Sequence, residues 1–165
     1  MNVVKPTAAL SSILLLLARL GLGVIFLAHG LQKLVTNGMA ATTEGFAAMG
    51  VPLPGVAAWF AALVETFGGA ALVLGVLTPI FAGLLALDML GALALVHLSN
   101  GLWVSNNGYE LVLALAAGAV ALAANGAGRL SVDAVLSKRG HQGQDSRPVH
   151  TAPEQTRAGG SAAQR

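Results

Sequence analysis

Cysteine is absent from this sequence of 165 residues, and charged residues make up only 10% of it. Without cysteine, the chain by itself cannot supply disulfides, iron–sulfur clusters, thiolate zinc sites or a thiol redox centre. A soluble domain usually has about a quarter charged residues, whereas 55% of this sequence is hydrophobic. The charges are few before residue 124 and crowd into the C-terminal tail. This profile predicts a small multi-pass membrane protein.

Four apolar runs could cross a bilayer as helices. They show no alternation of polar and apolar residues, which argues against membrane strands. Turns rich in glycine, proline and asparagine separate them. Arg19 interrupts the first run, which is also longer than the apolar part of a signal peptide, so we expect a retained helix. The predicted spans are residues 7–28, 56–77, 79–98 and 109–124.

These runs predict an all-α membrane protein, a bundle of four transmembrane helices over residues 7–136. Residues 137–165 have little apolar surface to bury, so we expect a disordered basic tail. Positive charge favours the cytoplasmic side of a membrane, and four spans would then place both termini in the cytoplasm. We interpret the basic tail as this topology signal rather than as a nucleic-acid site.

Small residues indicate where the helices meet. Gly68 and Gly69 follow Glu65 at the third and fourth positions, where they would let a neighbouring helix approach closely. One helical stripe in the fourth span predicts a packed inner face, and its members are Glu110, Ala114, Ala117 and Ala121.

Arg19, Glu65 and Asp88 are ionisable residues within the apolar runs. A charge at mid-membrane costs about 2.5–3.5 kcal/mol, so it needs a partner or a function. Counted from the outer ends of their spans, all three lie about 13–15 Å deep. We therefore expect a buried intramembrane charge cluster, in which Arg19 pairs with Glu65 and Asp88 is wholly or partly protonated. A purely structural role for this cluster stays open.

A second polar cluster is expected at the outer face. His29 and Lys33 share a helix face if the first helix extends past Ala28. Asp88 and His97 lie about 180° apart around an ideal helix, so they share a pocket only if the helix unwinds. We expect no metal site, and the interfacial position of the histidines argues against haem. The expected members of this cluster are His29, Lys33, His97, Tyr109 and Glu110.

Five motifs, in order, resemble the DoxX family. The resemblance covers about residues 10–136 and implies a four-helix bundle in the bacterial cytoplasmic membrane. Asp88 has no assigned place in the family pattern, and Ala127 stands where related chains often have proline. The motifs are residues 17–23 with 28–34, 65–79, 96–101, 108–110 and 128–133. The matching polar positions are Arg19, His29, Lys33, Glu65, His97 and Glu110.

The resemblance also implies a role. The family takes its name from a likeness to the membrane subunit of a thiosulfate:quinone oxidoreductase, and some members are associated with membrane oxidoreductase complexes. It implies a membrane subunit or anchor of a redox- or oxidative-stress-associated complex, with quinone as the candidate cofactor and soluble redox proteins as partners. Whether the chain is itself catalytic stays open.

Two other functions are weighed beside the redox role. The first is a non-catalytic assembly protein, in which the buried charges only hold the bundle and the tail recruits partners. The second, ranked last, is a small proton-coupled transporter, for which a homo-oligomer could create a path.

Overall fold

The computed structural model describes residues 7–142 of the chain. Within these residues it contains helices and turns and no strand. The segments η1 and η2 are π-helical, and η3 and η4 are short 3₁₀ turns. In chain order the elements are α1 (Ala8–Leu31), η1 (Gln32–Thr36), α2 (Gly38–Ala48), α3 (Pro54–Leu74), α4 (Thr78–Ala92), η2 (Leu93–His97), η3 (Leu98–Asn100), η4 (Val104–Asn106), α5 (Glu110–Asn125) and α6 (Val132–Gln142).

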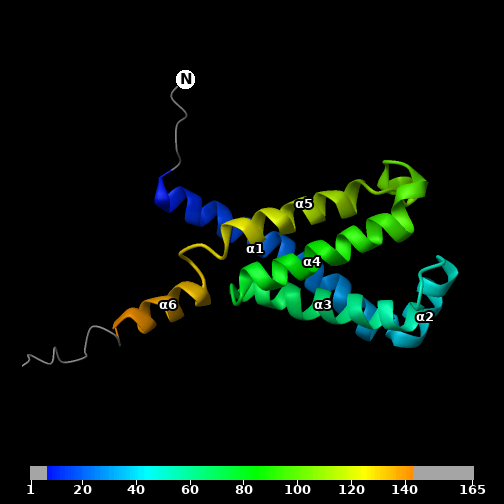
Figure 1. The fold of residues 1–165 in the computed structure, drawn as a ribbon, viewed down its shortest axis with the longest axis horizontal. Helices are drawn as coiled ribbons and strands as arrows, with labels where there is room; N and C mark the ends of the chain where they lie inside the picture. Colours follow the sequence, from blue (N-terminus) through cyan, green and yellow to red (C-terminus); the bar gives the residue numbers. More distant parts are fainter. Residues whose placement is uncertain (1–6, 143–165) are drawn as a thin grey trace, which may run out of the picture.

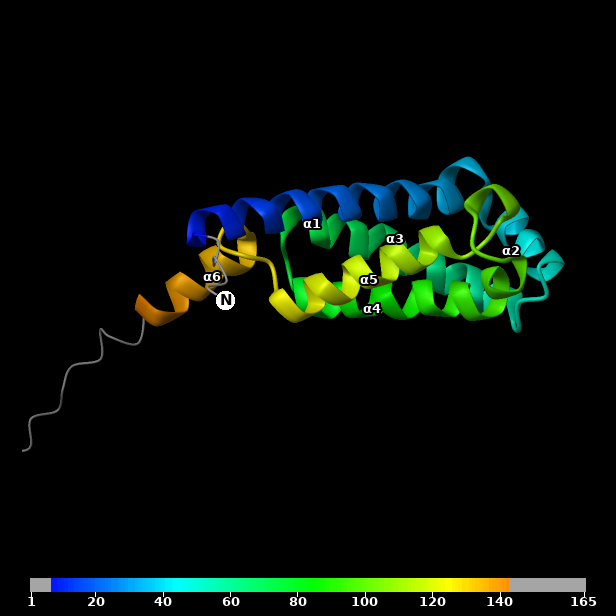
Figure 2. The ribbon, with the colours of Figure 1, turned by 90° about the horizontal axis from the view of Figure 1, so that it is seen from above.

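The long helices α1, α3, α4 and α5 form an elongated bundle (Figures 1 and 2). α1 packs on α3, α3 on α4 and α4 on α5, and α5 also contacts α1. We call the end with α2 and residues 98–109 the loop end, and the end with the α3–α4 turn and α6 the tail end. The start of α1 also lies at the tail end (Figure 2), so the two ends of the described chain lie at the same end of the bundle.

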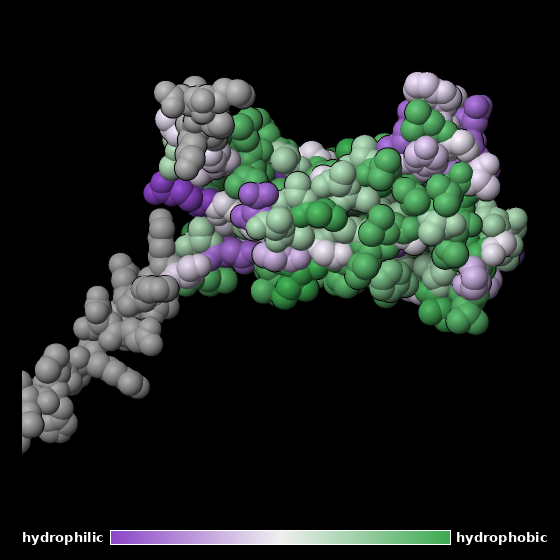
Figure 3. Space-filling view, turned by 45° about the horizontal axis from the view of Figure 1, so that its top comes forward, coloured by the Kyte–Doolittle hydropathy of each residue, from purple (hydrophilic) through white to green (hydrophobic). Residues whose placement is uncertain are grey.

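Three helices are long and apolar enough to cross a membrane: Ala8–Thr36, Pro54–Leu74 and Thr78–Asn100. α5 is apolar but shorter, with 16 residues. On the face shown in Figure 3, hydrophobic residues cover the middle of the bundle and hydrophilic residues gather toward its ends. Large apolar side chains such as Phe67 and Leu87 are exposed on the bundle, as expected for a surface that meets lipid. The expected all-α membrane architecture is confirmed.

The first transmembrane helix is longer than predicted. α1 passes the expected end at Ala28 and continues through η1 to Thr36. α2 lies in the connection between the first and second predicted spans, where no helix was predicted. Gly38, at the start of α2, has a φ of 76°, a left-handed conformation that glycine adopts without a steric penalty. The chain can therefore turn sharply there and lay α2 across the loop end.

Glycines bring the helices of the bundle close together. A β-carbon at Gly69 would lie 2.7 Å from the carbonyl oxygen of Gly23, and one at Gly68 would lie 3.0 Å from the Leu85 side chain. Gly69 therefore faces α1 and Gly68 faces α4, which confirms the close approach predicted for this pair. Such packing contacts matter in lipid, because apolar surroundings give the helices no hydrophobic drive to associate.

The buried face of α5 differs from the expected one. Ala114, Ala117 and Ala121 of the predicted inner stripe are exposed, so that prediction is wrong. The buried face is turned around the helix from this stripe, because its larger side chains bury more apolar area than alanine does, and two alanines lie on the same face. The buried residues of α5 are Val112, Leu115, Ala116, Ala119 and Leu122.

The last helix begins before the expected tail and continues into it. α6 crosses the predicted boundary at Ser137 and ends at Gln142. The rest of the predicted disordered tail, residues 143–165, lies outside the described residues.

Candidate functional site

The buried ionisable residues fall into two groups, one toward each end of the bundle. Arg19 hydrogen-bonds to residues that follow α5 at the tail end. Glu65 forms an ion pair with Lys33 of η1, toward the loop end. The expected pair between Arg19 and Glu65 is therefore wrong.

The alignment of α1 against α3 explains this error. Gly23 faces Gly69, and Arg19 lies against Gly75. Glu65 is ten residues before Gly75 on α3, a separation of about 15 Å along a helix. The depth estimate ended the first helix at residue 28, whereas the helix continues past that point, so Lys33 rather than Arg19 reaches the level of Glu65.

Arg19 links α1 to the chain that follows α5 at the tail end. Its Nη1 donates to the Ala127 carbonyl at 2.7 Å, and its Nη2 donates to the Leu130 carbonyl at 2.8 Å. The residue is only 2% exposed. Gly75 leaves space for the guanidinium group, since a β-carbon there would lie 2.7 Å from Arg19 Cζ. Main-chain carbonyls therefore offset the burial of this charge. We call Arg19, together with its acceptors Ala127 and Leu130, the structural clasp.

Asp133 joins the same clasp. Its carboxylate accepts hydrogen bonds from the N–H groups of Leu77, at 2.9 Å, and Thr78, at 3.2 Å. Its own N–H donates to the Gly75 carbonyl at 3.0 Å. The first N–H groups of a helix have no partner within the helix, so this carboxylate caps α4. The chain after α5 is thus tied to the α3–α4 turn.

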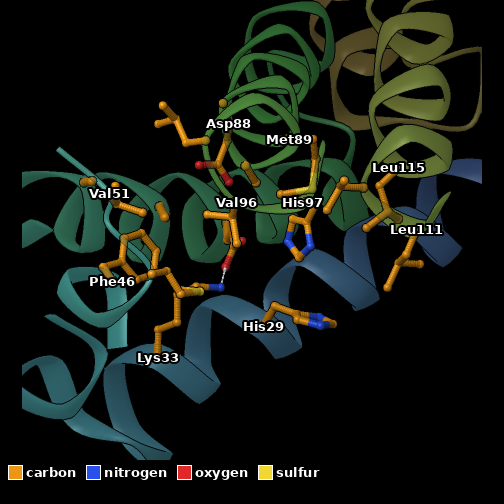
Figure 4. Close-up of a pocket in the computed structure, with 18 of the residues that line it drawn as sticks. His29, Lys33, Phe46, Val51, Asp88, Met89, Val96, His97, Leu111 and Leu115 are labelled. Atoms are coloured by element: carbon orange, nitrogen blue, oxygen red, sulfur yellow. Dashed lines mark hydrogen bonds and ion pairs between the residues drawn. The ribbon is translucent and has the colours of Figure 1, made fainter. Parts of the chain in front are cut away.

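A cavity of about 430 Å³ lies in the half of the bundle nearer the loop end (Figure 4). Pockets that bind small molecules usually measure about 300–1,000 Å³ and are mostly apolar. Apolar side chains from α1, α3, α4 and α5 form most of this wall. The polar lining residues are His29, Lys33, Glu65, Asp88, His97 and Asn107.

Three ionisable side chains meet at this cavity. Lys33 Nζ donates to Glu65 Oε2, and the two side chains are 19% and 5% exposed. Asp88 is close enough to interact electrostatically with both. Its Oδ2 is buried and has no hydrogen-bond partner within residues 7–142. Since buried polar atoms are normally paired, Asp88 offers an unused hydrogen-bonding position at the cavity.

Two π-helical segments place polar residues around this space. Lys33 lies in η1 and His97 lies in η2. A π turn contains more residues than an α turn, so the positions that follow it are shifted around the helix axis. Asp88 and His97 were expected to line one pocket only if the helix between them unwinds, and η2 supplies this unwinding. π turns within helices often occur at functional sites.

The two histidines differ in their positions. His97 Nδ1 is 2.8 Å from the Asn107 carbonyl, and His29 Nδ1 is 2.9 Å from the Ile25 carbonyl. A carbonyl only accepts, so Nδ1 is the donor in each of these two hydrogen bonds. His29 is exposed, and its ring points away from Lys33 (Figure 4). His97 is therefore the better placed of the two for a ligand in the cavity.

The remaining members of the predicted outer cluster, Tyr109 and Glu110, form hydrogen bonds to the connection that precedes α5. Glu110 Oε1 accepts from the Val104 N–H at 2.7 Å. The Tyr109 N–H donates to the Gly101 carbonyl at 3.0 Å. Neither Tyr109 nor Glu110 belongs to the cavity lining.

One part of the cavity wall, which comes from α2 and the turn after it, was not predicted from the sequence. Phe46, Met49 and Val51 line the cavity there. Large apolar residues in an otherwise small and polar connection were the available signal. Within residues 7–142, no group of three or more histidine and acidic side chains is arranged to hold a metal ion.

The fold and cavity define a small multi-pass membrane protein with a polar-lined site near one end of its helix bundle. The model of the DoxX family matches residues 14–98, more than half of the chain, and the protein belongs to this family.

Two relatives show the same kinship. The protein named "Putative oxidoreductase CatD" from Bacillus subtilis (strain 168) is 33% identical over 123 residues, covering 74% of this chain and 87% of CatD. The "Uncharacterized membrane protein Rv3486" from Mycobacterium tuberculosis (strain ATCC 25618 / H37Rv) is 31% identical over 131 residues, covering 73% of this chain and 80% of the relative. No solved structure matches the chain.

Proposed function

We propose that this protein is a membrane subunit or anchor of a redox-associated complex, and that its cavity holds a quinone head group. The observation that carries this proposal is the cavity, with apolar walls, one ion pair and the unpartnered Asp88 Oδ2. The name of the relative CatD, an oxidoreductase name, supports the same direction.

The chemistry of the lining residues fits a quinone. A quinone ring is flat and apolar, and its carbonyl oxygens accept hydrogen bonds. Phe26 and Met89 are buried cavity residues that would contact the ring. The Lys33 ammonium, and the Asp88 carboxyl when protonated, would donate to its carbonyls. A bound quinone would supply an acceptor for two electrons and two protons, while these residues would hold and orient it.

The proposal includes a source of electrons and a location. The chain has no cysteine, so the electrons would come from a soluble redox partner or from a cofactor that such a partner holds. The basic tail supports a cytoplasmic position for both termini in the bacterial inner membrane. The cavity at the loop end would then lie toward the outer face.

A rate measurement tests the redox role. Membranes containing the protein and its native partners are supplied with thiosulfate or a thiol, and quinone reduction is followed by absorbance. We expect Glu65→Gln to slow the reaction, because it removes the charge that holds Lys33. Glu44→Gln, at an exposed position on α2 outside the cavity lining, is the matched control. Equal rates in the two variants would exclude a role for Glu65 in the reaction.

A second candidate function is a non-catalytic anchor for soluble proteins. The clasp formed by Arg19 and Asp133 favours it, because it fixes the root of the tail to the bundle. Deleting residues 143–165 leaves these contacts in place. Under this function the deletion should abolish co-purification of soluble partners, and unchanged pull-downs would count against it.

A further inference from the structure

Part of the cavity wall also faces outward between α3 and α4. Phe60 of α3, Leu87 of α4 and Leu95 of η2 all line the cavity. They are nevertheless 46%, 64% and 53% exposed, respectively. All three lie within the spans that are apolar enough to cross a membrane, so their exposed surfaces meet lipid tails rather than water. The cavity is therefore continuous with a lipid-facing groove.

Gly91 lies between Leu87 and Leu95 on this part of the cavity wall. Leu87, Gly91 and Leu95 are spaced four residues apart and follow one face of the helix. A β-carbon added at Gly91 would meet nothing within 4 Å, so the helix surface is open at this point. Asp88 is three residues before Gly91 and also lines the cavity. The opening thus connects the lipid-facing surface with the polar part of the site.

We propose that this groove is a lateral portal that admits a lipid-soluble quinone from the bilayer and then holds its apolar tail. The proposal rests on the proposed function and names the ligand more closely, as a quinone with a long alkyl or isoprenoid chain. The ring would occupy the cavity near Asp88, while the tail would leave between α3 and α4. The tail would move from lipid into a groove that is also apolar. Binding therefore does not require the tail to pass the polar residues at the loop end.

A side chain that fills the groove tests the portal. The full-length protein is placed in nanodiscs, and dissociation constants are measured for two probes, a methoxybenzoquinone with a decyl tail and the same ring with a methyl group. Gly91→Phe should weaken binding of the decyl compound about tenfold or more, because the phenyl group occupies the path of the tail and the ring can then bind only with the tail displaced. The methyl compound should bind the variant and the unmodified protein equally.

Gly83→Phe is the matched control. Gly83 is also on α4 with nothing within 4 Å of an added β-carbon, and it does not line the cavity. Partition of each probe into lipid is the same for all variants, so the comparison reports on the protein. Unchanged decyl binding by Gly91→Phe would overturn the portal and leave the proposed quinone site standing. Failure of both probes to bind the unmodified protein would overturn the quinone site and the portal with it.

Crosslinking gives a second measurement that does not depend on how well a variant folds. A decyl quinone with a photoreactive diazirine at the tail end is bound to the unmodified protein and illuminated. Adducts should map by mass spectrometry to peptides that contain Phe60 or residues 87–95. Adducts confined to α1 and α5 would place the tail elsewhere and overturn the portal.

Discussion

At the scale of single residues, Glu65 and Asp88 are two buried carboxyl groups with different surroundings. Glu65 has a cation within hydrogen-bonding distance, whereas Asp88 Oδ2 has no partner within the described residues. Leaving a buried polar group unpaired costs about 1–3 kcal/mol. A protein that keeps such a group gives up stability at that position, which is expected where a ligand rather than the fold uses the residue.

Replacing Asp88 by leucine should therefore separate stability from binding. We expect Asp88→Leu to raise the free energy of unfolding by about 1–3 kcal/mol at most, because it removes a buried carboxyl oxygen, Oδ2, that has no partner within the described residues. Quinone binding should fall in the same variant. Thermal unfolding in detergent and a binding titration measure the two effects, with Leu85→Met, a conservative change at a buried α4 residue outside the cavity lining, as the control. Loss of stability together with intact binding would contradict this expectation.

The ion pair between Lys33 and Glu65 can be tested by a double-mutant cycle. Lys33→Met leaves the Glu65 carboxylate buried without its cation, and we expect a loss of about 1–3 kcal/mol in unfolding free energy. The double variant Lys33→Met with Glu65→Leu should recover much of this loss, because neither charge is then left unpaired. Chemical unfolding in mixed micelles measures all variants. Losses that simply add would show that the pair contributes no coupling.

At the scale of elements, apolar runs and turn residues were enough to predict the four long helices. They were not enough to predict α2 or the π-helical segments η1 and η2. A π turn depends on local hydrogen-bond geometry, and the residues Gln32–Thr36 and Leu93–His97 have no composition that distinguishes them from an α-helix. The cavity depends on these segments, so its membership could be predicted only in part.

The contact between α1 and α3 depends on glycine at one position. Gly69→Ala would place a β-carbon 2.7 Å from the Gly23 carbonyl oxygen, so the two helices must separate. We expect a loss of about 1–3 kcal/mol in unfolding free energy, the usual effect of overpacking. Gly21→Ala, with nothing within 4 Å, should instead be neutral or stabilising by up to about 1 kcal/mol. Thermal unfolding of both variants checks the contrast, and equal shifts would contradict it.

At the scale of the whole molecule, the sequence identified the buried charges correctly but paired them wrongly. Arg19 is held by the main-chain carbonyls of Ala127 and Leu130. Every residue has a carbonyl, so no residue type marks such acceptors in a sequence. The register between α1 and α3 also depends on where α1 ends, and the apolar run alone does not show that it continues through η1.

Truncation of the chain distinguishes the clasp from the tail beyond it. Deleting residues 127–165 removes both acceptors of Arg19 and the Asp133 cap of α4. We expect this deletion to destabilise the bundle by several kcal/mol, because it leaves a buried cation unpaired. Deleting only residues 143–165 should leave the unfolding temperature unchanged. Calorimetry in detergent measures both, and similar unfolding temperatures for the two deletions would contradict the role given to the clasp.

The clasp of Arg19 also has a consequence for biosynthesis. Arg19 precedes its acceptor Ala127 by 108 residues in the chain. At about 5–20 residues per second, the ribosome makes the first helix several seconds before it makes the carbonyls that satisfy this arginine. During that interval the first helix carries an uncompensated charge, so we expect it to stay beside the insertion machinery or at the water interface. The final insertion depth of the first helix is therefore set only when the last part of the bundle has been translated.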